Sequence, residues 1–237
     1  MTLASCARAM ISSMHRIHYR FGIVLLLILA TITFTLASPE GDGGRFVAVL
    51  LQATVLVAAV IASRAHRAVI ALSVVAAIVG VAGTAAALFG SGEFGDSSAA
   101  VVALLYLLLT PVALVNGLRK QFAEVGVVTL QTMFGVLCLY LLIGLLFGVA
   151  YDTVHQLSST PFFASGGHPG RDDFLYFSFT TLTTVGYGDL VAATNLGRSL
   201  AITEALVGQL YLVTVVAVII SNLEAVRPGQ RRKKTPA

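Results

Sequence analysis

The sequence predicts an all-α integral membrane protein with six transmembrane helices, and two observations carry this prediction. Of the 237 residues, 57% are hydrophobic and only 11% are charged, whereas roughly 25% are charged in an average soluble domain. The charged residues also leave six long apolar runs, in which Glu204 is the only charged side chain, at residues 21–39, 46–63, 68–92, 97–118, 125–151 and 199–223. Each run reaches the roughly 17 to 25 residues that a helix needs to cross about 30 Å of hydrocarbon. The composition therefore excludes a soluble enzyme, a nucleic-acid-binding protein and a disordered chain.

The basic residues predict on which side of the membrane the chain ends lie. With six spans both termini share a side, and placing them in the cytoplasm puts 12 of the 15 Lys and Arg residues in cytoplasmic segments. The opposite loops contain the other three, Arg45, Arg171 and Arg198, together with eight acidic residues. Because short cytoplasmic loops carry an excess of Lys and Arg, both termini are predicted to be cytoplasmic.

The first apolar run leaves one alternative open. A basic segment, an apolar stretch and the small residues of TLASPEG also resemble a cleaved signal peptide, although this run is longer than the roughly 7 to 15 residues of a signal core. The charge pattern fits both possibilities, because the second run would enter from outside in either case.

The connection between the fifth and sixth runs, residues 152–198, is longer than a turn between two helices requires. Its first part, residues 152–173, is rich in Ser, Gly, Pro and His, and it predicts an exposed loop with His155 and His168 as solvated side chains. Asp172 and Asp173 suit the N-cap and first turn of a helix. The roughly ten apolar and threonine residues that follow are too few to cross a bilayer. They predict a re-entrant helix whose carboxyl end, with its partial negative charge, lies within the membrane.

The next seven residues, 183–189, read Thr-Thr-Val-Gly-Tyr-Gly-Asp and are called the filter segment below. Non-helical backbone at membrane depth must line a water-filled path or be buried in protein, and glycine adopts the backbone angles that such a segment needs. The filter segment resembles the selectivity filter of potassium channels, in which rings of carbonyls replace the hydration shell of K⁺. The resemblance implies that K⁺, a permeant ion and not a cofactor, is coordinated at Thr184, Val185, Gly186 and Tyr187, with Gly188 as the outer turn.

The same resemblance covers residues 125–225 as outer helix, pore helix, filter and inner helix, and it assigns side chains that support the filter. Tyr176 stands where the family often has Trp, a residue that this chain lacks, and its hydroxyl is expected to reach Asp189. Thr180 stands where some relatives have a Glu that contacts the same Asp. The full set of expected filter supports is Tyr176, Thr180, Thr183, Asp189 and Glu204.

Two residues of the last run call for an explanation of their own. A charged group inside a span costs about 3 kcal/mol or more, so Glu204 is expected to brace the pore helix or filter from behind through Thr or Tyr hydroxyls. Direct contact with permeating ions is the alternative. Gly208 is expected to be a hinge of the inner helix, with close helix packing as the alternative. Gln209 and Thr214 are candidates for the cavity below the filter.

Together these features predict a potassium channel that conducts K⁺ passively. Residues 97–118 contain no Lys or Arg, so no charged fourth helix is available to respond to the membrane voltage. A ring of four filter strands and one GYG per chain predict a homotetramer in the lipid bilayer, with no enzymatic activity and no nucleic-acid partner. Two alternatives stay open: a K⁺ uptake transporter subunit, for which internal repeats would be expected, and a non-conducting K⁺-sensing membrane protein.

The predicted organisation has four parts in a multi-pass protein of the plasma membrane. They are a cytoplasmic N-terminal segment (1–20), a four-helix transmembrane domain (21–120), a pore domain (121–226) and a basic cytoplasmic tail (227–237).

Overall fold

The computed structural model describes residues 20–37, 42–63, 67–89, 108–117, 119, 130–158 and 160–225. Its helices are α2 (Arg20–Ala37), α3 (Asp42–Ala62), α4 (Arg67–Phe89), α6 (Leu130–Leu157), α7 (Arg171–Leu182) and α8 (Asn195–Ala225), and a further helical stretch covers Leu108–Gly117. Within the described residues, the regular structure is helical apart from an isolated β-bridge between Phe163 and Ala192. The expected cytoplasmic ends fall on residues 1–19 and 226–237, outside the described residues. The first apolar run forms α2, and the signal-peptide alternative stays open.

A helix lies in each of the six predicted apolar runs. This agrees with the need of backbone groups in hydrocarbon to find their hydrogen-bond partners within the same segment. Within the described residues, one helix, Gln131–Leu157, is by itself long and apolar enough to cross a bilayer. The shorter apolar helices are Phe21–Ala37, Phe46–Ala62, Val69–Gly83 and Leu108–Gly117. The number of six spans stays a prediction.

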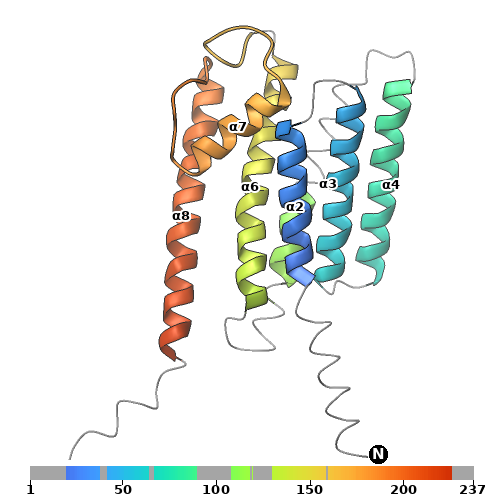
Figure 1. Cartoon of the computed structure of the whole chain (residues 1–237), viewed down its shortest axis with the longest axis vertical. Coiled ribbons are helices and arrows are strands. Elements are labelled where there is room, and N and C mark those ends of the chain that lie inside the picture. The colour runs from blue at the N-terminus through green and yellow to red at the C-terminus, as the bar shows by residue number, and fades with distance from the viewer. Residues whose placement is uncertain are drawn as a thin grey trace, which may run out of the picture.

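The long helices stand side by side, and α7 is inclined across the upper part of the bundle between α6 and α8 (Figure 1). α2 packs against α3 and α6, and α4 packs against α3. α7 contacts α2, α6 and α8, so the short helix is held from three sides. The main core joins α2, α3, α6 and α7 through buried side chains such as Ile28, Val55, Leu142 and Leu175.

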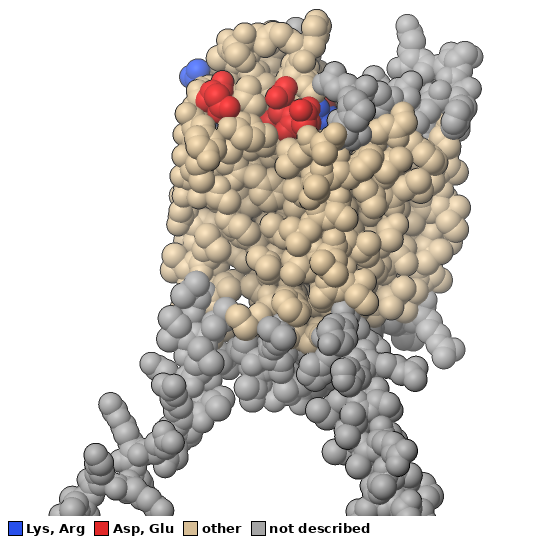
Figure 2. All heavy atoms as spheres, viewed as in Figure 1, with Lys and Arg blue, Asp and Glu red and all other residues tan. Residues whose placement is uncertain are grey.

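The charged side chains are distributed very unevenly over the surface. On the face shown in Figure 2, the Lys, Arg, Asp and Glu side chains of the described residues gather at the upper end, above a broad band without them. Large apolar side chains such as Leu26, Ile78 and Leu210 are exposed. An apolar band of this kind is the surface that a protein presents to surrounding hydrocarbon.

The structure corrects the predicted loop at residues 152–173. α6 continues to Leu157, and the side chain of Gln156 donates a hydrogen bond of 2.9 Å to Asp152, one turn earlier. Polar residues one turn apart can thus extend an apolar helix beyond its charge-free run. The prediction of a solvated loop histidine at 155 is therefore wrong, because His155 lies in the last turn of α6 with its ring 5.4 Å from that of Phe174. His168 is exposed, as expected.

Part of the same segment is buried, which the composition of the loop does not suggest. Phe162 and Phe163 form a cluster with Tyr151, Phe174, Phe177 and Ala192. Burial of the two large aromatic side chains is favourable because it removes apolar surface from water. The Ser and Gly residues around them are too small to contribute a comparable free energy. The connection is thereby packed onto the outer ends of α6 and α7.

The start of α7 also differs by two residues from the prediction. The N-cap is Gly170, and Asp172 and Asp173 both lie in the first turn. Asp173 Oδ2 accepts a hydrogen bond of 3.0 Å from the N–H of Gly170. The two carboxylates therefore act on the positive end of the helix from within its first turn.

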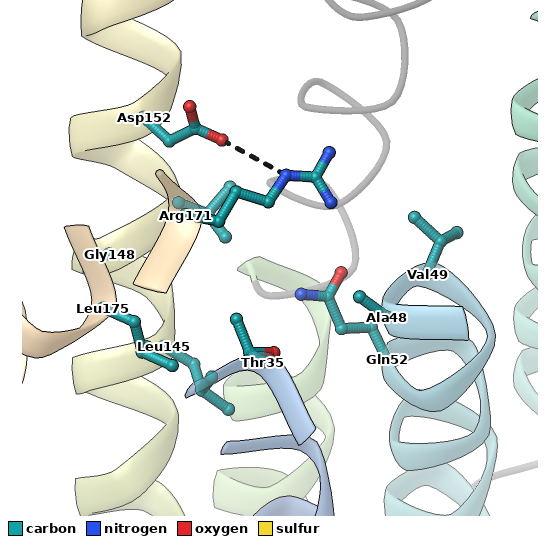
Figure 3. A pocket seen from close by; sticks show the side chains of 10 residues that line it. Thr35, Ala48, Val49, Gln52, Leu145, Gly148, Asp152, Arg171 and Leu175 are labelled. Atoms are coloured by element: carbon teal, nitrogen blue, oxygen red, sulfur yellow. Dashed lines mark ion pairs between the residues drawn. The ribbon is translucent and has the colours of Figure 1, made fainter. Parts of the chain in front are cut away.

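A small pocket of about 50 Å³, lined mostly by apolar side chains, lies where α7 begins, between α2, α3, α6 and α7. Figure 3 shows Arg171 and Asp152 pointing toward each other, with Arg171 Nε 3.9 Å from Asp152 Oδ2, and Gln52 of α3 extending into the pocket. A partly exposed ion pair contributes at most about 1 kcal/mol. Its effect here is to tie the first residue of α7 to the last turns of α6.

Candidate functional site

The filter segment begins where α7 ends, and its N–H groups turn back onto that helix. Thr183 caps the helix, and its N–H donates to Phe179 O at 3.1 Å. The N–H groups of Val185 and Gly186 both donate to the carbonyl of Thr180, at 2.9 and 3.1 Å. Within the described residues, no backbone or side-chain donor is bonded to the carbonyls at positions 184–187. These carbonyls remain available to a ligand.

Every second residue of the filter segment has a positive φ. The values are +58° at Thr184, +51° at Gly186 and +82° at Gly188. Glycine adopts this region at no steric cost, whereas a β-branched residue such as Thr184 is strained there. Alternation between left-handed and ordinary backbone is what turns successive carbonyls to one side. The glycines stand at two of the three positions that require it.

The side chains of the filter segment are exposed in the single chain. Val185 is 53% exposed and Tyr187 is 73% exposed. Val is among the residues that are most often buried in proteins. The filter segment is hydrogen-bonded to α7 on one side, and its exposed side chains show that its other side is open.

The outer end of the filter segment is attached to α7 through Tyr176. Its hydroxyl donates a hydrogen bond of 2.9 Å to Asp189 Oδ2, and its ring lies parallel to that of Tyr187, with centroids 6.3 Å apart. The hydrogen bond to the carboxylate raises the pKa of Tyr176 above its ordinary value. Ionisation of the phenol at high pH would remove the donor of this hydrogen bond. Phe177 points elsewhere, into the buried aromatic cluster.

Glu204 is fully buried behind the filter, where α6, α7 and α8 meet. It accepts a hydrogen bond of 2.6 Å from the Tyr151 hydroxyl of α6 and one of 2.5 Å from the Ser178 hydroxyl of α7. Ser178 Oγ also lies 2.7 Å from the carbonyl of Gly144 in α6. One carboxylate thus connects the inner helix to both of its neighbours.

The sequence reasoning missed Tyr151, Ser178 and Gly144. A signal for Ser178 exists, because Phe174, Ser178 and Leu182 follow one another at four-residue spacing along the buried face of α7. A single hydroxyl in an otherwise apolar stripe needs a partner of its own. Gly144 could not be found in this way, because what requires a glycine there is a tertiary contact. A Cβ at position 144 would lie 2.8 Å from the ring of Phe179.

The other predicted supports bond to their own helices. Thr180 Oγ1 donates to Phe177 O at 3.0 Å, and Thr183 Oγ1 donates to Phe179 O at 2.6 Å. Thr180 acts on the filter through its backbone carbonyl and not through its side chain. Thr214, a candidate for the cavity, donates to Leu210 O at 2.7 Å on α8.

Residues 136–225 match a protein-family model described as an ion channel. This part of the chain is similar to an ion channel domain. The match runs from α6 to the end of α8, so it contains α7, the filter segment and the Glu204 contacts. It supports a general ion-channel function and a membrane location, and the family suggests that the protein is not an enzyme. Comparisons with curated proteins and with solved structures returned no match.

Within the matched residues, Gly208 lies at a close contact between α8 and α7. α8 is continuous from Asn195 to Ala225, and a Cβ at position 208 would lie 2.6 Å from the carbonyl oxygen of Leu182. Close helix packing, the alternative to a hinge, therefore explains why residue 208 is a glycine. A hinge at this glycine stays a prediction.

Replacement of Gly208 by alanine is expected to destabilise the protein by about 1 to 3 kcal/mol, because backbone atoms of α7 must move to admit the methyl group. Thermal unfolding of the protein in detergent measures the change. Gly83 is the matched control: it lies inside α4, and a Cβ there meets nothing within 4 Å. Gly83→Ala should be neutral or stabilising, by up to about 1 kcal/mol. A Gly208→Ala protein as stable as the Gly83 variant would contradict the packing role.

Proposed function

We propose that the protein is a K⁺-selective channel that conducts K⁺ passively across the membrane. The observation that carries the proposal is the positive φ at Thr184, Gly186 and Gly188 in a Thr-Val-Gly-Tyr-Gly segment directly after a short helix. The four K⁺-coordinating positions are Thr184, Val185, Gly186 and Tyr187, through backbone carbonyls and the Thr184 hydroxyl. Gly188 forms the outer turn, which the Tyr176 bond to Asp189 supports.

The chemistry of this segment suits a monovalent cation. Carbonyl oxygens without other donors can replace the water molecules around K⁺ without supplying a full negative charge, so an ion can bind and also leave. The carboxyl end of α7 lies beside them and adds the partial negative charge of its dipole. Glu204, the only carboxylate within the six apolar runs of the sequence, accepts hydrogen bonds from two hydroxyls.

A homotetramer follows from the same proposal. One chain supplies one filter strand, and its open side would be closed by three further strands around a common axis. α8 carries exposed apolar side chains at Ile202, Leu206, Leu210 and Val213, which lipid or a neighbouring subunit would cover. The proposed channel is a six-span protein of the plasma membrane with both termini in the cytoplasm. It is not voltage-gated by a charged fourth helix.

Recording in planar bilayers tests the proposal. With a tenfold K⁺ gradient and Na⁺ as the balancing cation, the reversal potential of the wild-type current is expected near the K⁺ value, about 59 mV from zero. The matched negative control is Gly186→Asp, which should pass no K⁺. A reversal potential that ignores K⁺ would reject the proposal.

Rubidium flux into liposomes separates the two alternatives. A channel carries Rb⁺ down its gradient without a second ion, whereas a transporter subunit would require a coupled Na⁺ or H⁺ gradient. A K⁺-sensing protein would bind Rb⁺ and carry none.

A further inference from the structure

A side chain of the inner helix contacts the inner end of the filter segment. Gln209 Nε2 lies 3.1 Å from Thr184 Oγ1, and Thr184 Oγ1 lies 2.7 Å from the carbonyl of Thr183. A hydroxyl has one proton and two lone pairs. Because a carbonyl can only accept, the proton of Thr184 goes to Thr183, and Gln209 must be the donor in the other contact. The NH₂ group of the Gln209 amide, and not its oxygen, therefore faces Thr184.

This contact depends on the close approach of α8 to α7. Gly208 lies against the carbonyl of Leu182, and the next residue is therefore near enough to reach Thr184, two residues beyond Leu182. Thr184 is also the one non-glycine residue with a positive φ among those described. A strained β-branched residue keeps such a conformation only when its surroundings hold it. The Gln209 amide is one of the groups that hold it.

One lone pair of the Thr184 hydroxyl remains after both hydrogen bonds are counted. Gln209 occupies the first, and no described residue donates to the second. The oxygen is thus held in place by two hydrogen bonds and still has a free acceptor position. That is the arrangement a preorganised oxygen ligand for a cation needs.

We propose that Gln209 is a specificity-determining residue of the channel, because its side-chain amide positions the Thr184 hydroxyl as a ligand of the innermost cation site. The inference rests on the proposed function. Loss of the contact lets the Thr184 hydroxyl and the strained backbone change position. The site then discriminates less well between K⁺ and Na⁺. A hydrogen bond contributes about 0.5 to 1.5 kcal/mol, so we expect a roughly 2- to 12-fold fall in the K⁺ over Na⁺ permeability ratio. The half-saturating K⁺ concentration should rise over a similar range.

Two variants remove the contact in different ways. Gln209→Met keeps the length of the side chain without a donor, and Gln209→Asn keeps the amide but shortens its reach. The control is Thr203→Val, which removes an exposed hydroxyl of α8 that bonds to Ser199 of its own helix. We expect both Gln209 variants to lower the ratio and Thr203→Val to leave it unchanged. Permeability ratios come from channels that have assembled, so reduced folding yield does not mimic the effect.

A double variant tests whether Gln209 affects the permeability ratio by way of the Thr184 hydroxyl. Thr184→Val removes the hydroxyl, and adding Gln209→Met to it should cause no further fall in the ratio. Wild-type ratios and half-saturation in both Gln209 variants, with a K⁺-conducting wild type, would overturn the inference alone. A wild type that passes no K⁺ would overturn the proposed function and this inference with it.

Discussion

Gly186→Ala is expected to abolish K⁺-selective conduction. The φ of Gly186 is +51°, and a Cβ there would meet nothing within 4 Å, so the cost arises from the backbone and not from a clash. An L-residue pays roughly 1 to 2 kcal/mol in this region, or about 4 to 8 kcal/mol over the four strands of a tetramer. The strand would relax toward negative φ and turn a ring of carbonyls away from the ion path. Reversal potentials under K⁺ and Na⁺ gradients measure the loss.

The chain contains a matched control for this backbone effect. Gly166 has a φ of +69° and open space around it, but it lies in the connection between α6 and α7. Gly166→Ala should carry the same strain per chain and leave the K⁺ over Na⁺ permeability ratio unchanged. If Gly186→Ala channels were as selective as the Gly166→Ala channels, the carbonyls at this position would have no part in ion coordination.

Glu204→Ala is expected to lower the free energy of unfolding by about 1 to 3 kcal/mol, because it leaves the buried Tyr151 hydroxyl without its acceptor and leaves Ser178 with the Gly144 carbonyl alone. Tyr151 and Ser178 are both fully buried, so water cannot replace the carboxylate freely. Since Ser178 lies in α7, the filter segment should also lose conduction more quickly during sustained recording. Thermal unfolding in detergent and the decay of the bilayer current measure the two effects.

The conservative variant Glu204→Gln separates bracing from ion contact. It keeps the shape and removes one acceptor, so both effects should be intermediate. Thr203→Val is the control next to it on α8, since Thr203 is exposed and its hydroxyl bonds to Ser199 O of the same helix. Unchanged unfolding and unchanged current decay in Glu204→Gln would exclude the bracing role. A changed conductance with unchanged unfolding would favour direct contact with ions.

Much of the helical arrangement could be predicted, because the absence of charge over a long run has few other physical explanations. Helices lie in all six runs, and the match of residues 136–225 to an ion channel family confirms the resemblance at that level. The ends of the helices were harder to predict. Asp152 and Gln156 can continue α6 beyond its apolar run, and the burial of Phe162 and Phe163 depends on a cluster contributed by three separate segments.

The sequence by itself determined two of the three positions of positive φ in the filter segment, since Gly186 and Gly188 are recognisable by residue type, whereas the positive φ of Thr184 is not. It also determined that a lone carboxylate in an apolar run, Glu204, needs hydroxyl partners. Only the tertiary structure decided which partners these are, that Gly208 fits against the Leu182 carbonyl, and that Gln209 reaches Thr184. The physical reason is that residue type determines what a group requires locally, whereas the rotation and approach of α6, α7 and α8 determine which group meets that requirement.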